Sequence, residues 1–332
     1  MIKNSILVVG SSNTDMIIKL ERIPKPGETI IGGEFASAAG GKGANQAVGA
    51  ARAGGAVTLI ARVGQDMFGE KAVAGFVADG INVDYVVRDR TSPSGVALIF
   101  VGQNGENSIA VASGANARLT PADVRKAKGA FRKANVLLLQ LETPLDTVQA
   151  AAELAAAAGV RVILNPAPAR SLPDKLLRRV FLLTPNESEA ELLTGVAVEN
   201  AAGAVQAAEA LLARGAQNVI ITLGARGAWV AGKNLRQLIP AFKVKAVDTT
   251  AAGDIFNGTL ALGLAEGRSL LEAARFASAA AAISVTRMGA QTSAPTRKEI
   301  ERLLAAGNGS VGVIWGKGRP GPRHATQTLQ PA

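Results

Sequence analysis

Residues 248–254 read Asp-Thr-Thr-Ala-Ala-Gly-Asp, a run of small residues bounded by two carboxylates. An apolar stretch precedes the run and a helix-favouring stretch follows it, so we predict that it opens a helix. The first turn of a helix offers free N–H groups and a positive dipole end, which together bind anions. Asp254 would lie in that turn, where a base could take a proton from a hydroxyl that attacks a bound phosphate. The alternative is an ordinary helix start capped by Asp248 or Thr249.

A second segment, residues 40–45, reads Gly-Gly-Lys-Gly-Ala-Asn and predicts a glycine-rich helix start. It is not a P-loop, because Ala36 stands where the first glycine belongs and Gly43 replaces the Ser or Thr. Its lysine and amide can donate to oxygens, which suits a ligand rich in hydroxyls. A tight turn into a helix would explain the same residues.

Asn13 and Asp15 follow the first apolar run of the chain. Residues two apart on an extended chain point the same way, as a clamp for sugar hydroxyls requires. The alternative is a turn, since the surrounding Ser, Asn, Thr and Asp residues favour turns.

Two later segments suit a nucleotide and its metal ion. Residues 184–189 place Asn186 and Glu189 on one face of a predicted helix start, where Glu189 could hold a water on Mg²⁺ or cap the helix. Residues 222–227, Thr-Leu-Gly-Ala-Arg-Gly, end a predicted strand and begin a glycine-flanked loop. That loop could contact a nucleotide phosphate or ribose, or could be a simple hairpin.

Strands and helices alternate around these segments. Short apolar runs predict strands, and longer periodic runs predict helices. The predicted strands are 5–9, 57–63, 96–101, 108–111, 136–141, 160–164, 180–183, 218–223 and 242–247. The predicted helices are 42–53, 146–158, 187–194, 201–214, 252–266, 269–286 and 296–305. This alternation predicts an α/β fold, with a mostly parallel sheet covered by helices on both faces.

Two β-rich stretches, roughly 12–36 and 91–112, interrupt that rhythm. We interpret them as a small sheet that projects as a lid over the crevice at the strand C-termini, where ligands bind in open α/β sheets. We expect residues 1–306 to form one domain. Residues 307–332, rich in Gly, Pro and basic side chains, are expected to be disordered.

Composition excludes several classes of site. Hydrophobic residues make up 48% of the 332 and charged residues 19%, which excludes a disordered chain. The chain has no cysteine and one histidine, His324, so thiolate nucleophiles, Cys-ligated zinc and a Ser-His-Asp triad are excluded or unsupported. The net charge of +10 favours phosphate-bearing partners. The densest basic run, 125–133, has no interleaved aromatics, so we interpret it as a solvated helix face and do not expect nucleic acid binding.

The sequence also bears on location. No uncharged run is long enough to cross a bilayer, and no cleavable leader pattern is visible. Together with the absence of cysteine, this leads us to expect a cytoplasmic protein.

The order of these segments resembles the ribokinase-like (PfkB) carbohydrate kinases over about residues 5–305. The matching runs are 10–15, 41–45, 139–142, 164–170, 184–187, 221–224, 247–254 and 285–291. The resemblance implies ATP-dependent phosphorylation of a small sugar, first of all the 5-hydroxyl of D-ribose. It also implies that the lid often makes a homodimer contact.

The resemblance implies a role for each matched residue. Asp254 would be the catalytic base, beside an anion hole at Ala252 and Gly253. The residues that would hold the sugar are Asn13, Asp15, Gly41, Lys42, Gly43, Asn45 and Glu142. Those that would line the ATP site are Asn186, Thr222, Gly224, Ala225, Arg226, Gly227 and Ser278, with Glu189 near Mg²⁺. Those that would surround K⁺, several through backbone carbonyls, are Asp248, Thr250, Ser284, Arg287, Gly289 and Ser293.

Some positions depart from the family pattern, and other functions stay open. Ser278 stands where related kinases often have Asn or His, and Ala251 replaces a glycine common in the wider family. The same chemistry on deoxyribose, a ketohexose or a nucleoside is one alternative, although aromatics at 4% argue against a nucleoside. A non-catalytic basic binding protein on a kinase fold is another.

Overall fold

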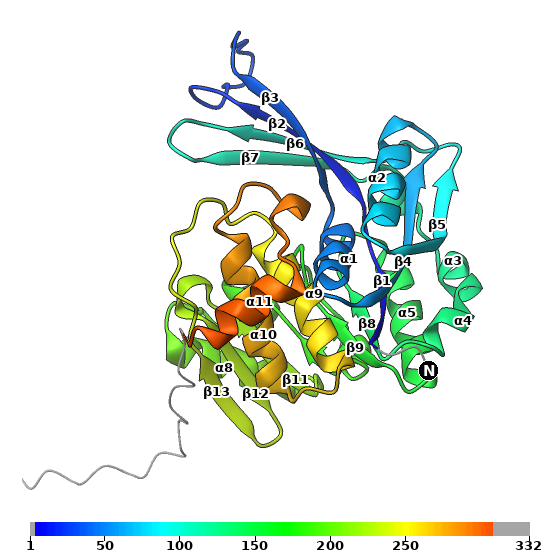
Figure 1. Ribbon diagram of the computed structural model, residues 1–332, viewed down its shortest axis with the longest axis vertical. Coiled ribbons are helices and arrows are strands. Elements are labelled where there is room, and N and C mark those ends of the chain that lie inside the picture. The colour runs from blue at the N-terminus through cyan, green and yellow to red at the C-terminus, as the bar shows by residue number, and fades with distance from the viewer. Residues whose placement is uncertain (1–3, 308–332) are drawn as a thin grey trace, which may run out of the picture.

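A twisted, mostly parallel sheet forms the centre of the computed structural model, which describes residues 4–307 (Figure 1). Within those residues the sheet has nine strands in the order β13-β12-β11-β10-β9-β8-β1-β4-β5, and β12 runs antiparallel to both of its neighbours, β11 and β13. The strands are β1 (Ser5–Val9), β4 (Ala56–Gly64), β5 (Asn82–Asp89), β8 (Val136–Leu139), β9 (Arg161–Leu164), β10 (Leu182–Leu183), β11 (Asn218–Thr222), β12 (Ala228–Gly232) and β13 (Leu235–Ile239).

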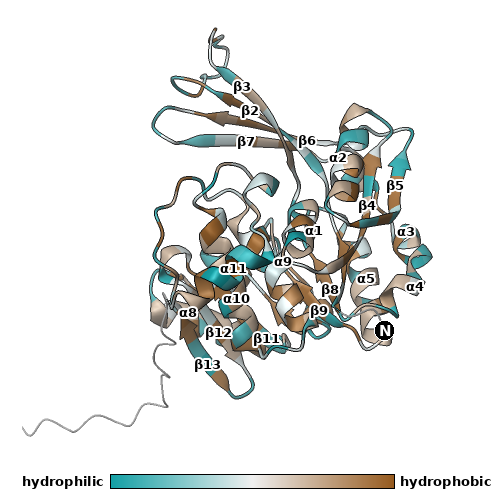
Figure 2. Cartoon of the chain, in the orientation of Figure 1, coloured by the Kyte–Doolittle hydropathy of each residue, from teal (hydrophilic) through white to brown (hydrophobic). Residues whose placement is uncertain are grey.

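Helices cover both faces of this sheet. Successive residues of β1 enter different cores: Ile6 and Val8 pack on one face, Leu7 and Val9 on the other. One core is completed by α1 (Lys42–Arg52), α2 (Met67–Ala78), α9 (Ala252–Ala265), α10 (Leu270–Ser284) and α11 (Arg297–Ala305). The other is completed by α3 (Pro121–Lys126), α4 (Lys128–Phe131), α5 (Leu145–Ala157), α6 (Asp174–Leu177), α7 (Glu187–Thr194) and α8 (Ala201–Ala213). The central strands are accordingly hydrophobic along most of their length (Figure 2). The predicted architecture is confirmed.

A second sheet projects from the body as the predicted lid (Figure 1). Its strand order is β3-β2-β6-β7, and its strands are β2 (Asn13–Lys19), β3 (Glu34–Gly40), β6 (Gly95–Val101) and β7 (Asn107–Ala112). The lid extends to Gly40, four residues beyond the predicted end of its first stretch. Because β3 runs directly into α1, the lid and the crevice share a boundary.

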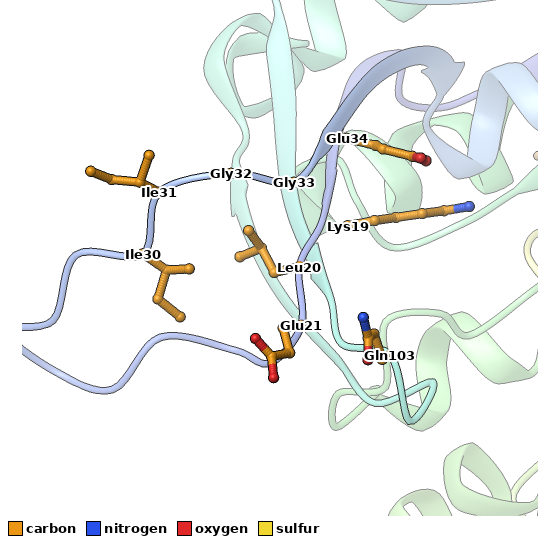
Figure 3. A pocket seen from close by; sticks show the side chains of 9 residues that line it. All are labelled: Lys19, Leu20, Glu21, Ile30, Ile31, Gly32, Gly33, Glu34 and Gln103. Atoms are coloured by element: carbon orange, nitrogen blue, oxygen red, sulfur yellow. The ribbon is translucent and has the colours of Figure 1, made fainter.

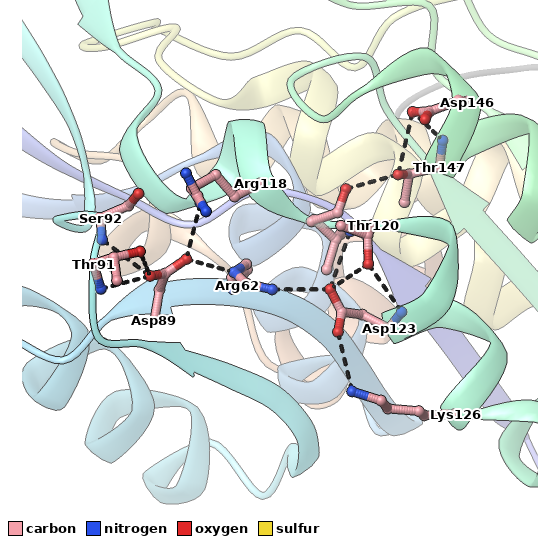
Figure 4. Close-up of polar contacts among 11 residues, drawn as sticks. Arg62, Asp89, Thr91, Ser92, Arg118, Thr120, Asp123, Lys126, Asp146 and Thr147 are labelled. Atoms are coloured by element: carbon pink, nitrogen blue, oxygen red, sulfur yellow. Dashed lines mark hydrogen bonds and ion pairs between the residues drawn. The ribbon is translucent and has the colours of Figure 1, made fainter.

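The root of the lid is held by partly buried ion pairs (Figure 4). Arg62 donates from Nε to Asp89 Oδ2 at 2.7 Å and from Nη1 to Asp123 Oδ2 at 3.0 Å. Asp89 also accepts the N–H groups of Thr91 and Ser92 at 2.8 and 2.9 Å. These contacts fasten the chain between β5 and β6 to the body.

The predicted strand at 242–247 is wrong. Those residues form an irregular segment, largely exposed, which lacks a neighbouring strand to pair with. The sequence analysis also missed α2, β5, β12 and β13. The basic run at 125–133 is split between the short helices α3 and α4, and its charged side chains are exposed. The tail predicted to be disordered lies outside the described residues, apart from Gly307. Among residues 4–307, none of the helices combines the length and hydrophobicity needed to span a bilayer.

Candidate active site

Polar residues gather where the parallel strands end. The segments that follow β1, β8, β9 and β10 carry Asn13, Glu142, Asn165 and Asn186, respectively. Helices α1 and α9 pack against each other and begin at the same edge. Hydrogen bonds join the start of α1 to the start of α9, so residues far apart in the sequence form one site.

The start of α9 is built without a side-chain cap. Ala251 occupies the N-cap position with a left-handed φ of 58°. Asp248 instead accepts the N–H groups of Thr250 and Gly289 at 2.9 and 2.8 Å. The alternative of a helix capped by Asp248 or Thr249 is therefore wrong. The Ala252 N–H already donates to Thr249 O at 3.2 Å. The next first-turn N–H group, at Gly253, lacks an intrahelical acceptor and could bind a phosphate.

Asp254 lies in this first turn and is only 6% exposed. Its Oδ2 accepts from Asn45 Nδ2 at 3.0 Å, and its Oδ1 accepts from Gln46 Nε2 at 2.9 Å. Burial raises the pKa of Asp254, while Lys42 and the two amides act in the opposite direction. A buried carboxylate with a raised pKa, beside free N–H groups, suits a general base.

Lys42 lies among carboxylates. Burial alone would lower the pKa of Lys42, but Asp254, Glu142 and Glu189 raise it overall. Glu142 Oε2 accepts the Lys42 backbone N–H at 3.0 Å and the Ser11 hydroxyl at 2.5 Å. The site therefore combines a protonated ammonium group with several acidic oxygens, which suits a ligand that both donates and accepts hydrogen bonds.

Asn13 and Asp15 occupy strand β2 of the lid, two residues apart as the clamp interpretation requires. Burial raises the pKa of Asp15 to about 6, with Glu142 and Asp254 adding to the effect. Asn13 is buried, and its Oδ1 accepts from Asn116 Nδ2 at 2.7 Å. The lid thus contributes Asp15 directly to the acidic group around Asp254.

Gly41 and Gly43 let two segments approach closely. Gly41 has a φ of 90°, and a Cβ there would lie 2.6 Å from the Asn13 nitrogen. A Cβ at Gly43 would lie 2.5 Å from the Ser11 nitrogen. These glycines bring the start of α1 against the loop after β1, which agrees with the predicted tight turn into a helix.

The segments predicted to contact a nucleotide lie side by side. Asn186 and Thr222 form an isolated parallel bridge, and Thr222 N–H donates to Pro185 O at 3.0 Å. The loop after β11 contains a 3₁₀ turn (Gly224–Arg226) and joins β11 to the antiparallel strand β12, so the hairpin alternative is correct. Arg226 donates to Glu187 and to Glu199 O, so its guanidinium is already engaged. The remaining ATP-site candidates lie in this loop and on two helices: Ala225 is exposed in the loop, Gly227 ends the loop, Ala252 begins α9, and Ser278 is half-buried on α10.

Glu189 caps α7 and also faces the site. Its Oε2 accepts the Asn186 N–H at 2.8 Å, and its Oε1 accepts Asn186 Nδ2 at 3.0 Å. Burial raises the pKa of Glu189, and the charge on Asp254 raises it further. The Asn186 N–H and Lys42 lower this pKa, but their effect is smaller. The capping alternative is thus correct, while the carboxylate keeps lone pairs that could accept from water on a metal ion.

The residues predicted to surround K⁺ lie mostly on two segments, before α9 and after α10, that are joined by hydrogen bonds. Val247 N–H donates to Val285 O at 2.7 Å, and Arg287 N–H donates to Ser284 O at 3.0 Å. Burial would raise the pKa of Asp248, but the Thr250 side chain and the N–H groups of Gly289 and Thr250 lower it overall. Ser293 is fully buried four residues after Gly289. Within residues 4–307 no cluster of three or more acidic or histidine side chains is arranged to hold a metal, so a cation here would rely on carbonyls, phosphate or water.

Sequence reasoning missed five polar residues that support the site: Ser11, Gln46, Asn116, Gln140 and Asn165. All are at most 6% exposed. All except Asn116 lie inside or next to the motifs, so a buried-polar signal in apolar surroundings could have identified Gln140 and Asn165. Their partners could not be identified in that way, because each partner is distant in sequence.

A separate pocket of about 460 Å³ lies at the outer end of the lid (Figure 3). Its lining includes Leu20, Ile30, Ile31 and Gln103. It contains none of the candidate site residues, so it is distinct from the site at Asp254.

Comparisons with known proteins find relatives that match nearly the whole chain. The model of the pfkB family carbohydrate kinases matches residues 3–297. A ribokinase of Haemophilus influenzae is 46% identical over 91% of this chain and 99% of its own length. A deoxyribokinase of Salmonella typhi is 38% identical over 90% of this chain and 98% of its own. The structure of Arabidopsis thaliana ribokinase complexed with ribose and ATP is 34% identical, with a TM-score of 0.83, and covers 92% of this chain and 99% of that one. The chain belongs to the pfkB family of carbohydrate kinases.

Proposed function

We propose that this protein transfers the γ-phosphate of ATP to the 5-hydroxyl of D-ribose, giving D-ribose 5-phosphate and ADP. The observation that carries the proposal is the position of Asp254: a buried carboxylate in the uncapped first turn of α9, facing Lys42 and Glu142. The 46% identity to a ribokinase over nearly the full length of both chains supports ribose as the sugar.

Asp254 accepts the proton of the ribose 5-hydroxyl as that oxygen bonds to the γ-phosphorus and the bond from phosphorus to the ADP oxygen breaks. Phosphoryl transfer has a loose transition state, so positioning supplies most of the catalysis and a modest base suffices. The N–H groups at the start of α9 stabilise charge on the transferring phosphoryl group. Asn13, Asp15, Lys42, Asn45 and Glu142 orient the sugar hydroxyls.

Mg²⁺ and K⁺ fit the donor sets available. Mg²⁺ supplies charge neutralisation for the phosphates when bound, and Glu189 would hold it through water. K⁺ would be held by Asp248 and by carbonyls of the loops at 248–250 and 284–293. The ionised state of Asp248, favoured by two N–H groups, suits a nearby cation.

Deoxyribose is the second candidate substrate, because a deoxyribokinase is 38% identical over similar coverage. A panel of ribose, deoxyribose, fructose and adenosine, with ADP release coupled to a dye, tests the proposal. Ribose should give the highest kcat/KM. Equal or better turnover of deoxyribose would reassign the substrate, and no turnover of any sugar would remove the kinase proposal. The same panel in potassium and in sodium tests the cation: equal rates after desalting would contradict a K⁺ site.

We also propose that the protein works in the cytoplasm, where ATP is available, as a homodimer through the lid. One face of the lid supports this. Met16 lies opposite Leu98, and Ile18 lies between Phe35 and Phe100, so these five apolar residues share a face. Phe35 is 70% and Leu98 46% exposed, which suits a surface covered by a second copy.

A further inference from the structure

Behind the catalytic carboxylate lies a chain of buried amides. Gln46 is fully buried and Gln140 is 1% exposed, so neither contacts a solvent-borne ligand directly. Gln46 Nε2 donates to Asp254 Oδ1 at 2.9 Å and to Asn165 Oδ1 at 3.0 Å. Gln46 Oε1 accepts from Gln140 Nε2 at 2.5 Å. Both hydrogens and the oxygen of the Gln46 amide are therefore in use.

The amide chain ends at two groups that only accept hydrogen bonds, the Asp254 carboxylate and the Thr184 carbonyl. These acceptors fix which way the Gln46 and Asn165 amides point. Asp254 as a carboxylate can only accept, so Gln46 must present its NH₂ group to it. Asn165 donates from Nδ2 to the Thr184 carbonyl at 3.2 Å, which leaves its Oδ1 for Gln46. Flipping Gln46 would place its oxygen against the carboxylate of Asp254 and against the Asn165 oxygen. The amide of Gln46 is thus held in one orientation.

At the Gln140 end of the amide chain, Gly10 leaves the space that the Gln140 side chain occupies. A Cβ at Gly10 would lie 2.1 Å from Gln140 Oε1 and 2.7 Å from the Gly43 Cα. Gln140 Oε1 is itself buried without a partner among the described residues. A buried polar atom left unpaired is costly, so we attribute the presence of Gln140 to what its NH₂ group does for Gln46.

We propose that Gln46 is a positioning residue for Asp254, holding Oδ1 of the base in place while Gln140 and Asn165 hold Gln46. This inference rests on the proposed function, because it needs Asp254 to be the base. The other oxygen, Oδ2, is held by Asn45, whose own Oδ1 accepts from Gln291 at 3.3 Å. Gln46 therefore completes the restraint of the carboxylate plane.

The ionisation of the base gives a second readout. The charged groups that act on or sense Asp254 are Lys42 on α1, Glu142 after β8, Asp15 on the lid and Glu189 on α7. The Gln46 hydrogen bond favours the ionised base and lowers its pKa. Its removal should move the acidic limb of the kcat profile to higher pH, since the base must be ionised to accept a proton.

The test compares Gln46→Met, which keeps length but removes the donor, with Thr259→Val as the matched control. Thr259 is fully buried on α9, and its hydroxyl has no partner among the described residues. Gln46→Met should lower kcat about 10- to 100-fold, as expected for a misplaced base, and shift the acidic limb upward. The KM for the sugar should stay within about threefold of wild type. Thr259→Val should leave kcat and the pH profile unchanged.

Three results would overturn the proposal: wild-type kcat and pH limb in Gln46→Met, the same losses in Thr259→Val, or a full further loss when Gln46→Met is added to Asp254→Asn. If Gln46 acts through Asp254, that further loss should be less than about twofold. Should Gln46→Met fail to fold, Gln140→Met must show a smaller loss and limb shift of the same sign, and wild-type behaviour there would reject the proposal. If wild type prefers another sugar, the substrate proposal fails while these comparisons proceed with that sugar.

Discussion

At the scale of single residues, the proposed phosphoryl transfer depends on Asp254 as the base. Asp254→Asn keeps the shape of the side chain but cannot accept the proton of the attacking hydroxyl. We expect kcat to fall by about 100-fold or more. ATP should still bind, because the first-turn N–H groups remain. A coupled assay measures kcat, and a separate nucleotide-binding measurement checks that ATP still binds. Unchanged turnover would remove the assignment of the base.

Asp15 makes the stability of the fold depend on pH. Its pKa is raised to about 6 by burial and by the neighbouring Glu142 and Asp254, whereas the unfolded chain titrates near 4. The folded state therefore binds an extra proton between these values, and the ionised side chain destabilises the fold above pH 6. Asp15→Asn should stabilise the protein by roughly 1–3 kcal/mol at pH 8 and by less at pH 4.5, while raising the sugar KM. Urea titrations at both pH values measure this, and a gain independent of pH would contradict it.

At the scale of elements, the lid depends on its root. Asp89 is buried, and its pKa is lowered by the Thr91 N–H and by Arg62, with burial opposing. A depressed pKa gives stability that is complete above the unfolded value near 4 and lost only as pH falls through the folded value. Asp89→Asn should therefore lower the free energy of unfolding by about 3 kcal/mol, equally at pH 5 and at pH 8.

The matched control for the lid root is Asp84→Asn, the same change at an exposed position of β5. Its effect on the free energy of unfolding should stay within about 0.5 kcal/mol. Urea midpoints for both variants measure the difference. Equal effects of the two changes would show that the Arg62 contact adds little.

At the scale of the whole molecule, the proposed homodimer would depend on the apolar face of the lid. Leu98→Arg places a charge on that face and should convert the proposed dimer to a monomer, because an unpaired charge would be buried in the interface. Val77→Arg, at a 58% exposed position on α2, is the control and should leave the dimer intact. Sedimentation velocity checks both. A wild-type monomer, or a dimer that persists in Leu98→Arg, would contradict assembly through the lid.

Local patterns in the sequence determined much of this protein. The parallel sheet, the lid and the helix start at Asp254 could be predicted because hydrophobic periodicity and small-residue runs are local signals. The failed strand at 242–247 has an apolar pattern but no neighbour, and strand formation requires a partner. The missed α2 carries two exposed apolar residues, Met67 and Val77, that blur its periodicity.

Only the tertiary structure decided how the site is held together. Asp254 meets Gln46 across 208 positions of sequence, and Ser11 meets Glu142 across 131. No local pattern specifies such pairs, because they arise from which strand ends the sheet order places side by side. The left-handed φ of Ala251 is likewise imposed by the surrounding loops, since alanine has no preference for it. The residue types therefore determine which chemical groups are available, and the packing of α1 on α9 determines which of those groups come into contact.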